Sequence, residues 1–292
     1  MPDLDFGSVP DIIKSAQSLF ETILEPRGLN AAILEGHKQV IEKIINDESI
    51  DSLTKIAFLS NYKKIVKEYK NCHSVAEKAL SNIKSDSEPN NVDEDWYSFF
   101  FDKVRLVSDE VLQNIWSQIL SGEINNPGSY SRSLLHTLSI MSTSQALLFS
   151  KLAQFCLKEY QKAPDGTPST LVHPLLFIST NRDAYKRYGF SVTKLLELER
   201  IGLINCDFRD EFVFMKKKVF QTGNFIVEVY GDPNNNHVIK AGNITLTADG
   251  QSLYNIIGNE YKQYSSEHLE HIITKLQNRN CEILINGKRI AP

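Results

Sequence analysis

The chain has 292 residues, of which 41% are hydrophobic and 23% charged, so it can bury a substantial core and divide into two or three domains. Its formal net charge of −4 gives no overall attraction to nucleic acid or to an anionic membrane. Any binding to nucleic acid or to a membrane would therefore have to depend on a local group of side chains.

The cysteines and the hydropathy pattern narrow the class further. The four cysteines lie far apart without C-x-x-C spacing, which predicts reduced thiols rather than a disulfide framework or a zinc knuckle. The sequence has no run of 18 apolar residues, and its start lacks the basic and apolar segments of a signal peptide. We therefore expect a cytoplasmic protein without a membrane partner.

Residues 1–88 are predicted to form a helical arm. Segment 9–25 has the apolar spacing of an amphipathic helix, and its mainly acidic polar face favours a partner helix over anionic lipid. Residues 28–84 keep helical spacing, with Asp51 or Ser52 as an N-cap. Because so narrow a segment has too little chain to bury its own stripe, we predict a hairpin or coiled-coil-like arm that makes a homo-oligomer.

A central module of four helices is predicted at 89–160. Ser108 is the expected cap of its second helix, whose doubled apolar stripe places a tryptophan in a helix-helix interface. Gly122 is expected to end that helix in a left-handed conformation, and Pro127-Gly128 to form a turn. The predicted core residues of the module are Trp96, Phe100, Trp116 and Leu120.

Glu123 has a catalytic and a structural interpretation. As a general base it would need a proton donor or a partner side chain within hydrogen-bond reach, and His136 is the only nearby candidate in the sequence. As a structural residue it would accept backbone or serine hydrogen bonds across the Pro-Gly turn. We favour the structural interpretation and predict no catalytic residue.

Segment 158–170 contains two prolines and a glycine and is expected to be a linker or an exposed loop. Beyond it, 171–292 alternates short strands and helices, which predicts an α+β part after a mostly α chain. His268 and His271 stand at i, i+3 on a predicted helix. That spacing suits a metal, but without a third ligand a solvated helix face is the preferred interpretation, and we expect no metal or cofactor.

Segment 92–155 carries the pattern W-x-x-F-F, then S-D-E-x-x-Q-x-x-W-x-x-I-L-x-G-E, then P-G-x-x-S and an A-x-x-F helix. In this pattern the chain resembles an uncharacterised bacterial family of unknown function and is similar to abortive-infection proteins of the alpha type. The resemblance implies a bacterial phage-defence setting and no specific activity. Segments 195–205 and 244–253 resemble the helix, strand and wing-to-helix sequence of a winged-helix domain, which implies extra strands in a long wing.

Lys216, Lys217 and Lys218 lie in or beside a predicted strand and are the candidate phosphate contacts if the winged-helix-like part binds DNA. Against this, residues 191–292 contain 12 Lys/Arg and 12 Asp/Glu. Nucleic-acid domains concentrate positive charge, because neutralised phosphates supply much of their affinity. No phosphate-binding loop, nucleophile elbow or dinucleotide fingerprint is present.

The sequence thus favours a non-enzymatic adaptor with an unidentified protein partner, in the phage-defence setting that the resemblance implies. A DNA-binding winged-helix regulator is the alternative, followed by an enzyme of unrecognised type.

Overall fold

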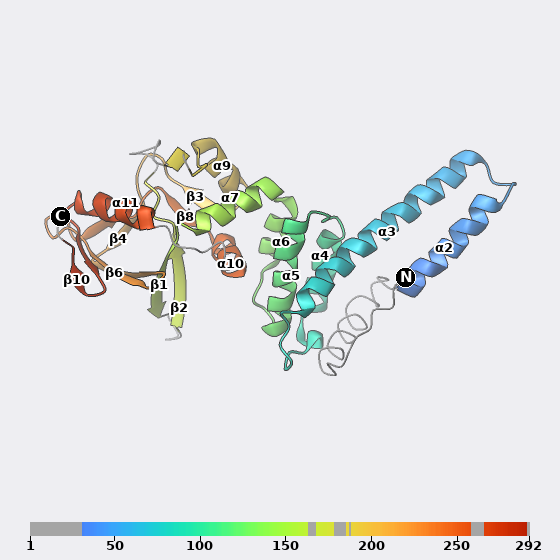
Figure 1. Cartoon of the computed structure of the whole chain (residues 1–292), viewed down its shortest axis with the longest axis horizontal. Coiled ribbons are helices and arrows are strands. Elements are labelled where there is room, and N and C mark those ends of the chain that lie inside the picture. Colours follow the sequence, from blue (N-terminus) through green and yellow to red (C-terminus); the bar gives the residue numbers. More distant parts are fainter. Residues whose placement is uncertain (1–30, 163–167, 178–184, 187, 258–265, 291–292) are drawn as a thin grey trace. The chain divides into compact units, whose positions relative to one another are not determined.

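The computed structural model describes residues 31–162, 168–177, 185–186, 188–257 and 266–290. By compactness the chain divides into two units, Met1–Ser139 and Ile140–Pro292. Its mixed α+β character is as predicted, and the strands of the described residues all belong to the second unit (Figure 1). The amphipathic helix predicted at 9–25 lies outside the described residues. Among the helices that are described, none has the length and apolarity needed to cross a membrane.

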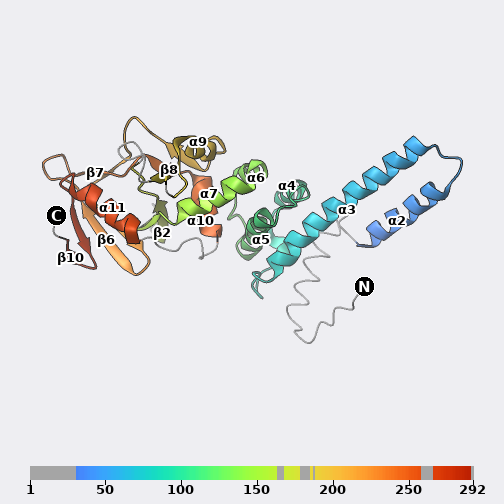
Figure 2. The same ribbon diagram turned by 45° about the horizontal axis from the view of Figure 1, so that its top comes forward.

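The described residues of the first unit are helical. The elements are α2 (Ala31–Asn46), α3 (Ser52–Leu80), the 3-10 turn η3 (Pro89–Asn91), α4 (Glu94–Val104), α5 (Glu110–Asn125) and α6 (Arg132–Ile140). Helices α2 and α3 lie side by side as a hairpin in both ribbon views, which confirms the predicted hairpin for the described part of the arm (Figures 1 and 2). Asp51 caps α3 by accepting the Thr54 backbone N–H at 3.0 Å, as predicted.

The polar residues of the S-D-E-x-x-Q motif connect α5 to α3. Asp109, one residue later than predicted, caps α5. The Ser108 hydroxyl instead accepts a 3.2 Å hydrogen bond from the amide of Asn71 on α3. Gln113 accepts a 2.9 Å bond from the hydroxyl of Ser74, also on α3. The motif is therefore explained by the attachment of α3 to α5.

Aromatic side chains fill the interior of this unit. Trp96, Phe100, Trp116 and Leu120 are all buried. The Phe100 ring stacks on Trp96 at a centroid distance of 5.1 Å and meets Trp116 edge-on at 5.2 Å. The indole N–H of Trp96 donates to the backbone carbonyl of Tyr130 at 2.8 Å. This bond holds the turn before α6 against the aromatic cluster.

The Gly-Glu pair near the end of α5 organises the Pro-Gly turn. The Glu123 carboxylate is 2% exposed and accepts backbone N–H bonds from Gly128 at 2.6 Å and Tyr130 at 2.9 Å. These bonds confirm the structural interpretation of Glu123. The prediction for Gly122 was wrong, because α5 continues to Asn125. A Cβ on Gly122 would lie 2.6 Å from the Tyr130 hydroxyl, so glycine is needed for the close approach of that ring.

The second unit combines helices with antiparallel sheets. Its helices are α7 (Thr143–Ala153), α9 (Val192–Arg200), α10 (Ala248–Ile256) and α11 (Ser266–Gln277). Its strands are β1 (Leu157–Lys162), β2 (Pro168–His173), β3 (Ile204–Cys206), β4 (Val213–Met215), β5 (Lys217–Thr222), β6 (Phe225–Tyr230), β7 (Val238–Lys240), β8 (Ile244–Leu246), β9 (Glu282–Ile285) and β10 (Lys288–Arg289). The main sheet has the order β10-β9-β6-β5-β1-β2, while β3-β8 and β4-β7 form separate pairs.

Residues 158–162 and 168–170 of the predicted linker or exposed loop instead belong to strands of the main sheet, and residues 163–167 lie outside the described residues. Strands β1 and β2 pair antiparallel, with Leu157 opposite His173 and Glu159 opposite Leu171. The prediction was wrong for these residues because a strand of a sheet can carry polar side chains on its solvent face: Tyr160, Gln161 and Thr170 are exposed. The Glu159 side chain points inward and is buried.

Helix α11 covers the inner face of the main sheet (Figure 2). Leu269, Ile272 and Leu276 pack there against a core that includes Phe220 and Val227. The expectation of a solvated His268–His271 face was therefore wrong for the first histidine. His268 is 4% exposed and packs edge-on to Phe155 at a centroid distance of 4.6 Å. Burial lowers the pKa of this imidazole to about 3, partly opposed by hydrogen bonds to backbone.

The different surroundings of Gly36 and Gly122 predict opposite effects of a glycine-to-alanine substitution on stability. Gly36 lies in α2, and no atom of the described residues is within 4 Å of the position that a Cβ would take there, so Gly36→Ala should stabilise the protein by about 0.5–1 kcal/mol through helix propensity. Gly122→Ala should destabilise it by about 1–3 kcal/mol, because the methyl group overpacks against the Tyr130 ring. Urea unfolding measures both.

Tyr130→Ala supplies the control, since Gly122→Ala should become stabilising when the ring is absent. Equal stabilisation by Gly36→Ala and Gly122→Ala in the otherwise wild-type protein would show that the Tyr130 ring moves aside freely.

Candidate functional site

The three lysines of the predicted phosphate-contact run do not share one environment. Lys216 lies between β4 and β5 with a φ of 67°, is exposed, and marks the point where the chain leaves one sheet for the other. Lys217 projects from the outer face of β5 and pairs with Glu228 at 2.5 Å. Lys218, the next residue, points to the inner face and pairs with Glu159 at 2.5 Å. Only Lys216 has no ion pair among the described residues.

The inner-face lysine belongs to a polar cluster of three residues, Glu159 on β1, His173 on β2 and Lys218 on β5, of which Glu159 is buried and the other two are partly buried. One Glu159 oxygen contacts the Lys218 amine and the other lies 2.9 Å from His173 Nε2. The register of the sheet explains why these three side chains are in contact. Leu157 stands opposite His173 and Phe220 opposite Glu159, so the three polar side chains are diagonal neighbours on one face.

The His173 ring is held in a defined orientation. Its edge faces Phe214 at a centroid distance of 4.8 Å, and the Lys218 amine lies 5.1 Å from the centroid of the same phenyl ring. Burial lowers the pKa of His173, while the adjacent Glu159 carboxylate raises it and Lys218 lowers it. The imidazole is therefore neutral at physiological pH, with Nε2–H directed to the carboxylate.

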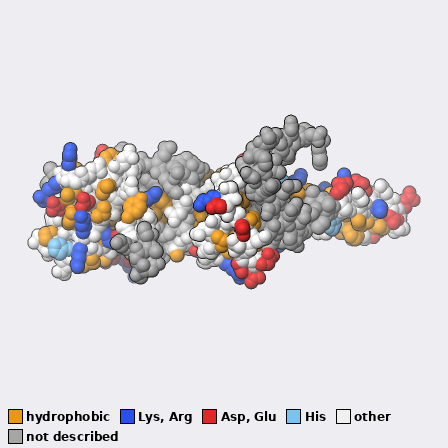
Figure 3. Space-filling view, turned by 90° about the horizontal axis from the view of Figure 1, so that it is seen from below, with side chains coloured by type: hydrophobic (Ala, Val, Ile, Leu, Met, Phe, Trp, Pro, Cys, Tyr) orange, Lys and Arg blue, Asp and Glu red, His pale blue; other side chains and the backbone are white. Residues whose placement is uncertain are grey.

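The arm presents a different kind of surface. Five large apolar side chains are exposed on it: Val40, Ile45, Leu53, Ile56 and Phe58. Leu53 is 77% and Ile56 59% exposed. Figure 3 shows hydrophobic side chains at the surface of the arm between acidic and basic ones. Such a concentration of exposed apolar area on a two-helix hairpin is typical of an interaction surface.

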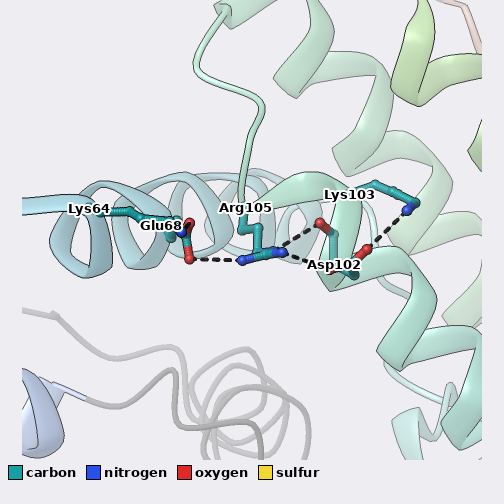
Figure 4. A network of polar contacts seen from close by, with 5 residues as sticks. All are labelled: Lys64, Glu68, Asp102, Lys103 and Arg105. Carbon is teal, nitrogen blue, oxygen red and sulfur yellow. Dashed lines mark hydrogen bonds and ion pairs between the residues drawn. The ribbon is translucent and has the colours of Figure 1, made fainter. Parts of the chain in front are cut away.

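A charged network attaches the arm to the helical module (Figure 4). The Arg105 guanidinium, just after α4, contacts Glu68 of α3 at 3.2 Å and Asp102 at 3.0 Å. Lys64 lies 3.9 Å from Glu68, and Lys103 lies 2.9 Å from Asp102. Glu68 is the least exposed member. The network therefore fixes α3 at the point where it leaves the module.

Sequence reasoning identified the lysines but missed Glu159 and His173. It placed Glu159 in a linker and gave His173 no role. The available signal was alternation: Leu157, Glu159 and Gln161 occupy one face of a strand, as do Leu171 and His173. The described ranges contain no group of three His, Cys, Asp or Glu side chains that could hold a metal ion.

The electrostatic account of His173 predicts opposite pKa shifts in two variants. Glu159→Gln should lower the His173 pKa further, because it removes the charge that favours the imidazolium. Lys218→Met should raise it, because it removes a neighbouring cation. Imidazole 1H–15N spectra over a pH titration measure both, with the signal assigned by its loss in His173→Gln.

The same shift fixes the sign of a stability effect. The folded-state pKa of His173 is below the ordinary 6.5, so the unfolded chain binds the proton more readily than the folded chain. The contribution of His173 to the free energy of unfolding is therefore lost as the pH falls below 6.5. A wild-type pKa above 6.5, or shifts of the same sign in both variants, would contradict the assignment.

Comparison with known proteins places the sequence of this chain in a family. The family model described as "Protein of unknown function (DUF2806)" matches residues 61–270. The match begins within α3 and runs through the central helices, the inner-face cluster and most of the second unit. No curated protein and no solved structure matches the chain. Because the match spans well over half of its length, the chain belongs to this family of unknown function.

Proposed function

We propose that this protein is a non-enzymatic interaction protein, an adaptor, that self-associates through its helical arm. The observation that carries the proposal is the set of exposed apolar side chains on α2 and the first half of α3. Leu53 and Ile56 are adjacent on one face of α3, and Val40 and Ile45 add exposed apolar area on α2. Within the described residues, the arm is a hairpin of two helices, which provides no second layer in which to bury these groups.

A second copy of the hairpin is the partner that this surface fits best. Two hairpins can pair as a four-helix bundle, which buries the apolar faces of all four helices. A twofold arrangement needs only one self-complementary patch, so a single chain supplies the whole interface. Helix α2 carries two Lys and two Glu, whereas α3 carries six Lys and two Glu, so the pairing has to keep the α3 lysines outside the interface.

The biological setting is part of the proposal and rests on resemblance. The motif at 92–155 is similar to that of abortive-infection proteins of the alpha type, which supports a cytoplasmic bacterial phage-defence role. The catalytic alternative for the same motif is weakened because both oxygens of Glu123 accept backbone hydrogen bonds. The adaptor would bind its protein partner through a surface other than the arm.

DNA binding by a winged helix is the second candidate. Helix α9 is followed by β3, which pairs antiparallel with β8, and α10 starts directly after β8. This order supports a winged-helix interpretation in which β4 to β7 are inserted in the wing. The candidate ranks second because Lys217 and Lys218 are already paired with carboxylates.

Self-association can be tested with two matched double variants of the arm. Leu53→Lys with Ile56→Lys places charge on the exposed apolar face of α3, and Gln39→Lys with Asn46→Lys adds the same charge at exposed polar positions that share another face of α2. At roughly tens of micromolar, light scattering should give an oligomer for the wild type and for the second variant, and a monomer for the first. A monomeric wild type, or equal masses for both variants, would reject the arm as the interface.

DNA binding makes a separate prediction. We expect no duplex affinity tighter than about 10⁻⁵ M near physiological salt, which is the range of non-specific association. Fluorescence anisotropy with labelled duplex at two salt concentrations measures it. Submicromolar, salt-sensitive binding that is lost when Lys216, Lys217 and Lys218 are all changed to Ala would favour the regulator over the adaptor.

A further inference from the structure

The second unit contains a pocket of about 610 Å³ that is lined in part by His173 of the polar cluster. Its walls come from β2, the segment around β4, the end of β8 and the start of α10. Most of the lining is apolar, and Phe212 and Phe214 form one wall between the pocket and the core. Its size and lining are typical of sites that enclose small organic molecules.

The charged groups near the pocket are already neutralised. Glu211 lines the pocket, but both of its oxygens lie 2.7 Å from the Arg279 guanidinium. Behind the wall, Lys218 and Glu159 neutralise each other in the same way. The pocket therefore presents no net charge to a ligand, which disfavours both anions and cations because their desolvation would not be repaid.

Several polar groups of the lining are also engaged. The Gln251 side-chain amide bonds the N–H and C=O of Val172 at 2.9 and 2.8 Å. The Thr247 hydroxyl donates to the Gly202 carbonyl and accepts from the Gly250 N–H. These bonds close the edge of β2 and cap α10, so neither group is available to a ligand.

His173 supplies the polar atom that is available. Its Nε2 faces Glu159, and Nδ1 forms no hydrogen bond with the described part of the chain. With Nε2 protonated toward the carboxylate, Nδ1 carries the lone pair and acts as an acceptor. The Thr245 hydroxyl lies in the same lining and can add a second, neutral contact.

We propose that this pocket binds a neutral, largely apolar small molecule of the size of a substituted aromatic ring system, which donates a hydrogen bond from an N–H or O–H group to Nδ1 of His173. The aromatic wall provides contact area, and the fixed imidazole selects for the donor. The proposal is independent of the arm, so self-association and ligand binding can fail separately.

Indole and benzofuran are suitable probes, because they are nearly equal in size and only indole has an N–H donor. Amide 1H–15N spectra of the full-length protein would be followed during titration. We expect saturable shifts at Leu171, His173, Phe214 and Ala248, with a dissociation constant for indole of about 1 mM and one for benzofuran about fivefold higher. Indole-5-carboxylate should bind more weakly than indole.

Three variants locate the site. Ala248→Trp should fill the pocket and abolish binding of both probes, and His173→Phe should make their affinities equal. Leu147→Trp places the same indole in a separate pocket of this unit, lined by Leu147, Lys151 and Lys194, and should leave both affinities unchanged. Equal wild-type affinities would overturn the role of His173. Binding that survives Ala248→Trp in a folded variant, or no saturable shift at about 20 mM probe, would overturn the site.

Discussion

The burial of the last third of α3 is the constraint on which the first unit depends. From Asn71 to Ala79, the side chains facing α5 are buried, among them Cys72, Val75 and Ala76. Small residues there let the two helices approach closely, and burial raises the pKa of the Cys72 thiol to about 12, so it packs as an uncharged group. The first half of α3 has no buried side chain. The arm is thus fixed at its base, and apolar residues farther along it are not required by this core.

Features determined by neighbouring residues could be predicted from the sequence. The Asp51 cap and the contacts of Glu123 involve partners at most seven positions away, so a short pattern contains both donor and acceptor. Gly122 shows the limit of such reasoning. A glycine near a helix end usually terminates the helix. At position 122 glycine is needed instead because the Tyr130 ring lies close, and the position of that ring depends on how the Pro-Gly turn folds back.

The second unit was harder to predict because its polar residues are paired over long separations. Glu159 meets His173 at 14 and Lys218 at 59 positions away, so no local window distinguishes this strand from a polar linker. His268 was assigned to a solvated face for a similar reason. Its helical neighbours are acidic, but the aromatic ring that buries it, Phe155, comes from the segment before β1.

Strand geometry also limits what a run of lysines can do. Successive side chains of a strand point to opposite faces, so Lys217 and Lys218 could not contact the same phosphate row even with no other constraint. A lysine on the inner face needs an opposite charge beside it, because a buried unpaired ammonium is costly. One oxygen of Glu159 pairs with the Lys218 amine, and its other oxygen contacts His173 Nε2. The imidazole is consequently oriented but kept neutral, which leaves the adjoining pocket with a directed acceptor and no charge of its own.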